Sequence, residues 1–375
     1  MNSQNLPTIA IVGSRGIPAN YGGFETFAEE IAVHLHRIYN YDVTVVCDQE
    51  QFITNNKMTE YKGVQLRYSK YSKSAKAIRF YKDSIDKVVE DHDIVYSCGP
   101  AGGLFGPLVR YHGKIMMTNP DGLNSKRSKW SWPIQMAFRA FEFLASRFSD
   151  WVVCDSKAIE EYIQKSYRCK HTKVAEYGAY RNEYMDDTGV TRAVLSGYKL
   201  KPNGYHLVVS RLEPENNVDV ILSGYLKRDR KLPLVVVGNL NDTNFVRDLQ
   251  KMACDNVRFI GGVYNKKHLS ILRAHSASYL HGHSVGGTNP SLLEAMGSMN
   301  LCICHDNEFN REVVQNCGIY FKGSSDVNKC IESVENKRGD LTGKREAALL
   351  RVENYYNWEN MAAKYNQIFL NAFKG

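Results

Sequence analysis

The segment HGHSVGGTNPSLLEAMG, residues 281–297, has the residue types of an anion-binding loop. An apolar strand-like run leads into it, and a helical run, 292–296, follows. Between the two runs lie Gly286, Gly287, Thr288, Asn289 and Pro290. Asn is a preferred N-cap residue, Pro suits the first helical position, and glycines let backbone N–H groups approach a ligand. Because N–H groups at a helix N-terminus attract phosphate, the spacing predicts a phosphate site, with an ordinary strand–loop–helix turn as the alternative.

Other polar residues follow apolar strand-like runs, where parallel sheets bind their ligands. In SRLEPENN (210–217), the guanidinium of Arg211 suits bidentate binding of a diphosphate, and Glu215 lies in the same loop. In NPDGLNSKRSKW (119–130), Asp121, Lys126 and Arg127 together are more than a turn requires. We therefore favour a functional role for Asp121 over a simple Asp-Gly turn.

Two further sites of interest are a glycine-rich loop and a pair of histidines. The loop 13–23 opens a helical run, so the amides of Gly22 and Gly23 are candidates to contact a phosphate or a sugar. Its spacing is not G-x-G-x-x-G, so no dinucleotide cofactor is predicted. His281 and His283 flank a glycine at a strand end. We expect structural histidines with satisfied hydrogen bonds there, with a ligand contact by one of them as the alternative.

The elements that must position these residues alternate between strands and helices in both halves of the chain. This alternation predicts parallel sheets with right-handed crossovers. A polar stretch without strong periodicity, roughly 180–203, separates the halves. We expect an N-terminal Rossmann-like domain over 1–185, a second over 200–355, and a C-terminal helix, 356–375, that packs back on the first. The fold class is α/β, with two doubly wound domains whose strand carboxyl ends face one cleft.

Composition narrows the class of protein. The chain has 375 residues, of which 43% are hydrophobic and 23% charged, as in an ordinary globular protein. Its nine cysteines are scattered and indicate reduced core thiols. No signal peptide or membrane span is apparent, so a cytoplasmic location is expected, at most peripheral to a membrane. No strand-end carboxylate pair is present to hold a cation, so no metal is expected.

Basic residues are concentrated in two places. The net charge is +8, and eight Lys or Arg residues lie between Lys62 and Lys87. Such a run suits nucleic acid, anionic lipid or an anionic substrate, and a solvated face is an equal alternative. The segment 127–151 combines aromatic residues with Arg and Lys. As a helix it would lie in a membrane interface, with the core face of an N-terminal-domain helix as the alternative.

Taken together, the motifs resemble those of the retaining glycosyltransferase family 4, which has the GT-B architecture. The resemblance rests on YGGFETF after the first strand, SRLEPENN, GGTNPSLLEAMG and the closing NWENMAAKYNQIF. More narrowly, the opening segment, NPDGLNSKRSKW and HGHSVGGTNPSLLEAM resemble bacterial rhamnosyltransferases of capsule and cell-wall polysaccharide assembly.

The resemblance implies a metal-independent hexosyl transfer, with L-rhamnose moved from dTDP-rhamnose to a lipid-diphosphate-linked saccharide at the inner face of the membrane. It implies that the loop 286–289 holds the diphosphate with Arg211, that Glu294 accepts hydrogen bonds from the ribose, and that Asp121 orients or deprotonates the acceptor. No nucleic-acid partner is implied. A nucleotide-sugar epimerase or dehydrogenase, and a non-catalytic nucleotide-binding scaffold protein, are the alternatives.

Two positions depart from the broad family pattern. That family pairs two glutamates separated by seven residues, and here Gly286 stands where the first would be, before Glu294. The family also has a lysine five residues after the arginine of the RL motif, where this chain has Asn216. We therefore expect the backbone of 286–288 to replace the first carboxylate. Arg211 and the helix N-terminus at Pro290 would carry the diphosphate charge, with Arg15 or Lys126 as further candidates.

Overall fold

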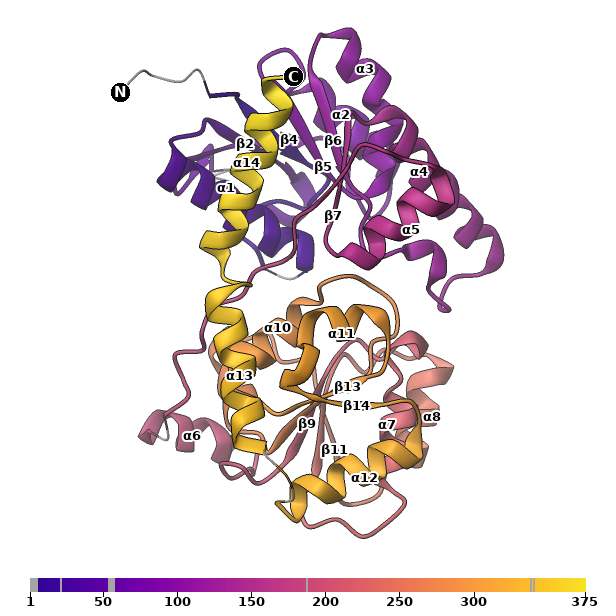
Figure 1. Cartoon of the computed structure of the whole chain (residues 1–375), viewed down its shortest axis with the longest axis vertical. Helices are drawn as coiled ribbons and strands as arrows, with labels where there is room; N and C mark the ends of the chain where they lie inside the picture. The colour runs from indigo at the N-terminus through magenta and orange to yellow at the C-terminus, as the bar shows by residue number, and fades with distance from the viewer. Residues whose placement is uncertain (1–5, 21, 53–57, 187, 338, 340) are drawn as a thin grey trace. The chain divides into compact units, whose positions relative to one another are not determined.

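A computed structural model of the chain describes residues 6–20, 22–52, 58–186, 188–337, 339 and 341–375. These residues form two compact units (Figure 1). Unit 1 contains the residues up to Lys126, Trp130–Tyr177 and Trp358–Gly375. Unit 2 contains Arg127–Lys129 and Gly178–Asn357. The chain therefore leaves unit 1 after Tyr177 and returns to it at Trp358.

Unit 1 is built on an eight-stranded sheet with strand order β3-β4-β2-β1-β5-β6-β7-β8. All neighbouring strands are parallel except β3 and β4 at one edge. The strands are β1 (Ile9–Val12), β2 (Val43–Asp48), β3 (Glu60–Tyr61), β4 (Val64–Ser69), β5 (Ile94–Cys98), β6 (Ile115–Asn119), β7 (Trp151–Cys154) and β8 (Thr172–Val174). The α-helices are α1 (Gly23–Tyr39), α2 (Ala77–Asp86), α3 (Gly106–Tyr111), α4 (Trp132–Phe148), α5 (Lys157–Tyr167) and α14 (Trp358–Phe373). Short 3-10 turns are η1 (Gln49–Phe52), η2 (Pro100–Phe105) and η3 (Asn124–Lys126).

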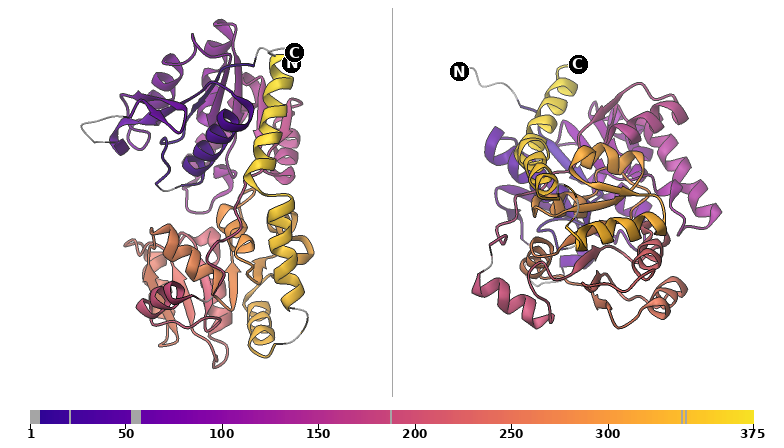
Figure 2. Two further views of the ribbon diagram at one scale, coloured as in Figure 1. Left: turned by 90° about the vertical axis from the view of Figure 1, so that its left-hand side faces the viewer. Right: turned by 60° about the horizontal axis from the view of Figure 1, so that its bottom comes forward.

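The C-terminal helix α14 completes the core of unit 1. Tyr365 and Phe369 are buried against Phe27 of α1 and Tyr96 of β5, with ring centroids 5.2–5.9 Å apart. The hydroxyl groups of Tyr96 and Tyr365 are 3.1 Å apart. Figure 2 shows α14 against unit 1 from two further directions. This helix is therefore part of the first core although it ends the chain.

Unit 2 has a six-stranded parallel sheet with strand order β11-β10-β9-β12-β13-β14. The strands are β9 (His206–Val209), β10 (Leu234–Val237), β11 (Val257–Gly261), β12 (Ser278–His281), β13 (Cys302–His305) and β14 (Ile319–Phe321). The α-helices are α6 (Gly189–Gly197), α7 (Val218–Tyr225), α8 (Asn244–Met252), α9 (Lys266–Ala274), α10 (Pro290–Gly297), α11 (Glu308–Val314), α12 (Ser324–Glu335) and α13 (Leu341–Asn354). The 3-10 turns are η4 (Pro214–Asn216) and η5 (Gln315–Cys317).

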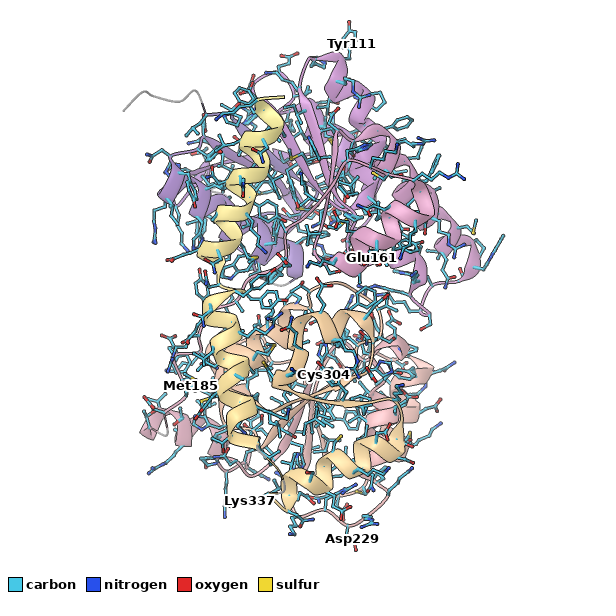
Figure 3. All side chains as sticks on the ribbon, in the orientation of Figure 1. Tyr111, Glu161, Met185, Asp229, Cys304 and Lys337 are labelled. Carbon is cyan, nitrogen blue, oxygen red and sulfur yellow. The ribbon has the colours of Figure 1, made fainter. Side chains whose placement is uncertain are left out.

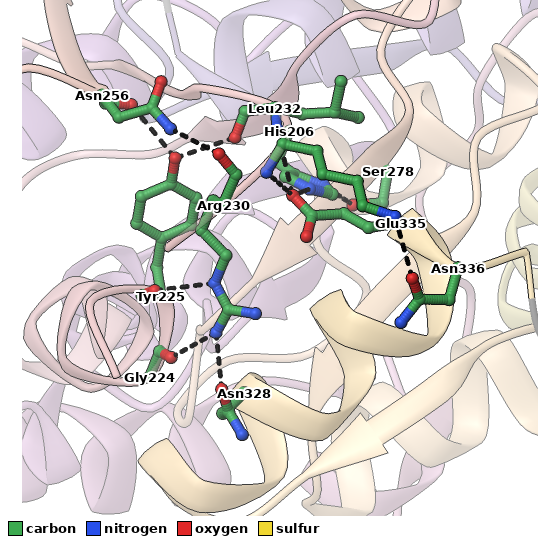
Figure 4. Close-up of polar contacts among 11 residues, drawn as sticks. His206, Gly224, Tyr225, Arg230, Leu232, Asn256, Ser278, Asn328, Glu335 and Asn336 are labelled. Carbon is green, nitrogen blue, oxygen red and sulfur yellow. Dashed lines mark hydrogen bonds and ion pairs between the residues drawn. The ribbon is translucent and has the colours of Figure 1, made fainter. Parts of the chain in front are cut away.

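A polar network fixes α7 and α12 at the amino end of this sheet (Figure 4). Arg230 donates to the carbonyl oxygens of Gly224 and Tyr225, at 2.9 and 2.8 Å, and to Asn328 Oδ1. His206 is fully buried, with Nδ1 2.8 Å from Ser278 Oγ and Nε2 3.6 Å from Glu335 Oε1. Because Arg230 contacts both helices, the network holds α7 and α12 at fixed positions on the sheet.

The structure confirms the predicted fold class of two parallel-sheet α/β domains. The central strands β1 and β10 are buried along their whole length, as expected for parallel sheets covered on both faces. All nine cysteines are free thiols, and seven of them are buried. Among the described residues, none of the helices has the length and apolarity needed to cross a membrane.

Candidate functional site

The carboxyl edge of the unit 2 sheet brings together the predicted loops of that unit. The strand β9 ends before Ser210 and Arg211, β12 ends before Gly282, and α10 begins at Pro290 with Asn289 as its N-cap. Asn289 Oδ1 accepts a hydrogen bond from the Ser291 amide at 3.0 Å, which confirms the predicted start of this helix. The Ser291 hydroxyl lies 2.7 Å from the Tyr279 hydroxyl and 3.3 Å from the Val209 carbonyl oxygen. These contacts fix the first turn of α10 against the ends of β9 and β12.

The two glycines before α10 have the properties that an anion-binding loop needs. Gly286 has a φ of +130°, and a Cβ placed on it would meet no atom within 4 Å. Among the described residues, the amides of Gly286 and Gly287 donate no hydrogen bond. Two backbone donors are therefore open at the N-terminus of an eight-residue helix, where the helix dipole favours negative charge.

Glu294, predicted to contact a ribose, is held by a buried cation. Its Oε2 is 2.6 Å from Arg273 Nη2, and the Arg273 side chain is 6% exposed while that of Glu294 is 46% exposed. Arg273 also donates to Ser291 Oγ at 3.1 Å. The carboxylate is therefore fixed on one side by Arg273 and accessible on the other, which suits a group that accepts hydrogen bonds from a ligand.

Arg211 lies in a charged cluster at the end of β9. Its side chain is half exposed, and Nη1 is 3.7 Å from Glu213 Oε1. Lys129 Nζ is 2.9 Å from the same carboxylate. Burial raises the pKa of Glu213, but the hydrogen bond from Lys129 and the charge of Arg211 outweigh burial and leave the pKa below its usual value. The exposed guanidinium is available to an anionic ligand.

Glu215 and Asn216 hold this loop together. Glu215 is buried; its carbonyl oxygen accepts hydrogen bonds from the amide and hydroxyl of Ser284, at 3.0 and 2.9 Å. Asn216 is also buried and donates to the Arg211 carbonyl oxygen at 2.7 Å. Asn216, which stands in place of the family lysine, therefore stabilises the loop conformation. One carboxylate oxygen of Glu215, Oε1, is buried without a hydrogen-bond partner.

Two histidines at the end of β12 differ from the sequence prediction. The rings of His281 and His283 stack at 4.3 Å with an interplanar angle of 10°, and His281 also stacks on Tyr279 at 5.9 Å. His281 is 1% exposed, and neither of its ring nitrogens has a hydrogen-bond partner in the described structure. The expectation of a satisfied structural histidine is therefore wrong for His281.

Both imidazoles are neutral at physiological pH. Burial, followed by the charge of His305, lowers the pKa of His281 to about 3. Burial also brings the pKa of His283 well below its usual value, and His281, Arg211 and Arg127 lower it further. A neutral imidazole offers one donor and one acceptor, so this pair suits hydroxyl groups of a ligand. The only sequence signal for this histidine pair was the position of two histidines on either side of a glycine at a strand end.

In unit 1, Asp121 forms a tight turn after β6. Asp121 has a φ of +63°, and its amide donates to Asn119 Oδ1 at 2.8 Å. Its Oδ1 accepts from the Gly122 amide and its Oδ2 accepts from Asn124 Nδ2, each at 2.8 Å. Both carboxylate oxygens thus have local partners, as an Asp-Gly turn predicts. Lys126 lies in the same segment, with Nζ 4.1 Å from the centroid of the Tyr162 ring.

A glutamate lies at the N-terminus of α1, beside Gly22 and Gly23. Glu25 is buried, and its Oε1 accepts from the Arg15 amide at 2.9 Å. A Cβ placed on Gly22 would overlap the other oxygen of Glu25. A carboxylate at a helix N-terminus competes with an anion for the same dipole, so this loop suits sugar hydroxyls better than phosphate. Glu25 was missed by the sequence analysis, although it lies within YGGFETF.

Lys73 also lies at this edge of unit 1. Its Nζ donates to the Gly13 carbonyl oxygen at the end of β1. It stands 5.9 Å from the centroid of the Tyr81 ring and 5.6 Å from that of Phe24. The sequence analysis counted Lys73 only as part of the basic run, because nothing in its spacing distinguishes it from its neighbours.

Comparison with known families identifies the class of the second unit. Residues 199–341 match the family model "Glycosyl transferases group 1", so the chain contains a glycosyltransferase group 1 domain. Residues 6–180 match a family model described as a domain of unknown function, DUF1972. No curated protein matches the chain.

Solved structures of similar fold cover the whole chain. Sucrose-phosphate synthase from Thermosynechococcus elongatus is 13% identical, with a TM-score of 0.80 over 98% of this chain and 99% of that one. A glycosyltransferase from Rickettsia africae is 16% identical, with a TM-score of 0.75 over 99% and 100% of the chains. HepE from Anabaena, solved in complex with UDP-glucose, is 14% identical, with a TM-score of 0.74 over 98% and 99%. The chain therefore has the GT-B glycosyltransferase fold.

Proposed function

We propose that this protein is a retaining, metal-independent glycosyltransferase that moves L-rhamnose from dTDP-rhamnose to a lipid-linked saccharide in bacterial surface polysaccharide synthesis. The observation that carries the transferase assignment is the pair of open amides, Gly286 and Gly287, at the N-terminus of α10, within a glycosyltransferase group 1 domain. A diphosphate is the group that such a site fits. HepE, whose fold is similar, is described in complex with UDP-glucose, which supports a nucleotide-sugar donor.

The proposed chemistry depends on charge that develops on the leaving diphosphate. Amides and a guanidinium that already point at this charge stabilise it without reorganisation. Gly286, Gly287 and Thr288 supply backbone N–H groups, Asn289 sets the helix start, and Arg211 supplies a cation. Glu294, aligned by Arg273 at 2.6 Å, accepts hydrogen bonds from the ribose hydroxyls. The acceptor hydroxyl attacks from the face that the diphosphate leaves, and a phosphate oxygen takes its proton.

The donor sugar needs contacts that replace the missing first glutamate. We assign these to the backbone at Gly286 and to the neutral pair His281 and His283, since both ring nitrogens of His281 and the Nδ1 of His283 are buried without a hydrogen-bond partner in the described structure. Glu215, which has a buried oxygen without a partner, lies in the loop bonded to Ser284 and is a further candidate. A neutral donor–acceptor pair suits the hydroxyl groups of an uncharged sugar.

The acceptor is proposed to bind unit 1. Asp121 retains lone pairs on both carboxylate oxygens beyond its turn bonds, so it remains the candidate to orient the acceptor hydroxyl. Lys126, in the same segment, is the second catalytic candidate and a further candidate for charge on the leaving diphosphate. Gly22 and Gly23, beside the buried carboxylate of Glu25, are assigned to sugar hydroxyls.

We propose metal independence because the site supplies its own positive charge. The positive charge that a metal would supply is assigned instead to Arg211 and to the dipole of α10. The proposed location is cytoplasmic, at the inner face of the membrane where a lipid-linked acceptor lies, and no nucleic-acid partner is proposed.

The test combines binding with turnover. A panel of nucleoside diphosphates and nucleotide sugars, dTDP-rhamnose and UDP-glucose among them, is compared for thermal stabilisation of the full chain, and nucleoside diphosphate release is then measured with a lipid-linked acceptor. We expect stabilisation by the donor and its nucleoside diphosphate, and release only when acceptor is present. The variant Arg211→Gln should weaken stabilisation by dTDP roughly tenfold in apparent Kd, as for loss of one charge-assisted contact.

Arg247→Gln, in α8, is the matched control, because the side chains of Arg211 and Arg247 are 50% and 49% exposed and each lies near a carboxylate a few residues away in the chain. Absence of stabilisation by every nucleotide in the panel would reject the proposed donor site. Donor binding without release in the presence of acceptor would instead support a nucleotide-binding scaffold.

A further inference from the structure

The helix α4 buries two polar side chains against unit 1 and leaves several large apolar side chains exposed. Its three fully buried residues are Glu142, Ala145 and Ser146. Its opposite side exposes residues at helical spacing, with Trp132 72%, Met136 41% and Phe143 44% exposed. Ala140 and Arg147 are exposed on the same side. An ordinary surface helix buries its apolar side chains, but α4 half-buries Phe138, Phe141, Leu144 and Phe148 and leaves a second set of apolar side chains exposed.

Contacts on the buried side fix this orientation. Glu142 accepts hydrogen bonds from the Ser125 hydroxyl at 3.0 Å and the Tyr167 hydroxyl at 2.7 Å. The helix also rests directly on a glycine of η2, because a Cβ on Gly103 would lie 2.5 Å from Ala145 Cα. Rotating α4 about its axis would place larger side chains against Gly103 and would remove the hydrogen-bond partners of the buried Glu142 carboxylate. The apolar face therefore stays exposed because of the packing beneath it.

The charges on and near α4 are basic. Its one acidic residue is the buried Glu142, whereas Arg139 and Arg147 are exposed. By contrast, four cations of the Lys62–Lys87 run have carboxylate partners: Lys62 pairs with Glu29, Arg67 with Asp91, Lys70 with Asp83 and Lys82 with Asp86. Half of the eight cations in the Lys62–Lys87 run are therefore paired with carboxylates. The helix α4 instead combines exposed cations with exposed aromatic side chains.

We propose that the exposed face of α4, formed by Trp132, Met136, Ala140 and Phe143 with Arg139 and Arg147, is a docking surface for an anionic lipid bilayer. An interfacial helix places aromatic and aliphatic side chains among the acyl chains and basic groups at the headgroups. Trp at one end of the face suits the interface itself. In Figure 1, α4 lies at the outside of unit 1, on the side away from α1, and Figure 3 shows side chains projecting outward there. This deepens the proposed peripheral location and rests on it, but it is independent of which sugar is transferred.

The experiment is vesicle flotation of the full-length protein. The full chain is needed because a fragment that ends near residue 180 lacks α14, and its absence would expose Phe27 and Tyr96 of the unit 1 core. Vesicles contain phosphatidylcholine alone or with roughly 30% phosphatidylserine, at about 0.05 M and about 0.5 M salt. We expect binding to the anionic vesicles at low salt, reduced at high salt.

Two variants separate the apolar and charged contributions. The triple variant Trp132→Gln, Met136→Gln, Phe143→Gln should lower the partition coefficient about tenfold or more, since the removed side chains are those that enter the bilayer. The double variant Arg139→Gln, Arg147→Gln should weaken binding and reduce its salt dependence. The matched control replaces three apolar residues of unit 2 by Gln: Val190, Leu240 and Leu350, which are 48%, 43% and 53% exposed. This control should bind to vesicles as the natural chain does.

Retention of the natural chain in the soluble fraction with anionic vesicles at low salt would overturn the inference. An equal loss of vesicle binding in the control variant would also overturn it. So would a dimer of the natural chain that the α4 triple variant dissociates, because a second copy would then be what covers this face. Thermal stabilisation by nucleoside diphosphate is measured on the same samples. If the protein binds nucleotide but not vesicles, only the docking surface is rejected. If it binds vesicles but not nucleotide, only the donor site is rejected.

Discussion

The buried His281 makes unit 2 sensitive to mild acid. Its folded-state pKa is lowered to about 3 by burial, whereas an unfolded histidine titrates near 6.5. Below about pH 6.5 the unfolded chain therefore binds a proton that the folded chain does not, and stability falls as the pH falls. Between about pH 7 and about pH 5, this one group removes about 2 kcal/mol from the free energy of unfolding.

The perturbation that isolates this term is His281→Phe. Phenylalanine keeps a ring between Tyr279 and His283 and removes two buried nitrogens that have no partner. We expect the variant to be at least as stable as the natural chain at about pH 7, because no hydrogen bond is lost. Its loss of stability between about pH 7 and about pH 5 should be smaller by about 2 kcal/mol. The pH dependence of unit 2 stability that remains in this variant is assigned to His206, His283 and His305, whose pKa values burial also lowers.

The assay uses the position of the tryptophans. All four, Trp130, Trp132, Trp151 and Trp358, lie in unit 1, so tryptophan fluorescence follows that unit, while far-UV circular dichroism follows both. Denaturant unfolding is recorded with both signals at each pH, and the transition seen only by circular dichroism is assigned to unit 2. The same loss of unit 2 stability in His281→Phe and in the natural chain would refute a neutral, buried imidazole at this position.

Two further predictions concern the donor site. Glu294→Gln should lower kcat/KM for the donor, and it should also cost about 1–3 kcal/mol of stability, because the buried Arg273 loses its carboxylate partner at 2.6 Å. Unchanged donor kinetics in a folded variant would reject the ribose role. Comparison of the stability of the variant with and without nucleotide separates the two effects. Activity should be unchanged by excess chelator, since the diphosphate charge is assigned to Arg211 and to α10; loss of activity that magnesium or manganese restores would contradict that assignment.

Much of the fold was predictable because its signals are local. Apolar runs bounded by glycine and polar residues gave the strands, and the Asn289-Pro290 pair gave the start of α10. The helix α6 was not predicted, since it lies in the polar stretch taken as a linker. Its capping box, Thr188 with Thr191, uses threonine where glutamate or glutamine is usual.

The parts of the site that sequence reasoning missed depend on tertiary contacts. Glu25 was missed because its burial and its hydrogen bond from the Arg15 amide are tertiary features. The functional role of Asp121 stays a prediction, since its turn bonds with Gly122 and Asn124 do not test it. The orientation of α4 is set by Gly103 and by the partners of Glu142, which lie elsewhere in the chain. Periodicity identifies an apolar stripe, but only the packing decides whether the stripe faces the core or the solvent.

The return of the chain to unit 1 at Trp358 has a consequence for synthesis on the ribosome. Every residue of unit 2 has been translated before α14 emerges, so unit 2 is complete while the core around Phe27 and Tyr96 still lacks Tyr365 and Phe369. A nascent or prematurely terminated chain therefore displays aromatic surface from its first domain until its last helix is made. Such a surface is what chaperones and proteases recognise, so synthesis of α14 decides when the unit 1 core is closed.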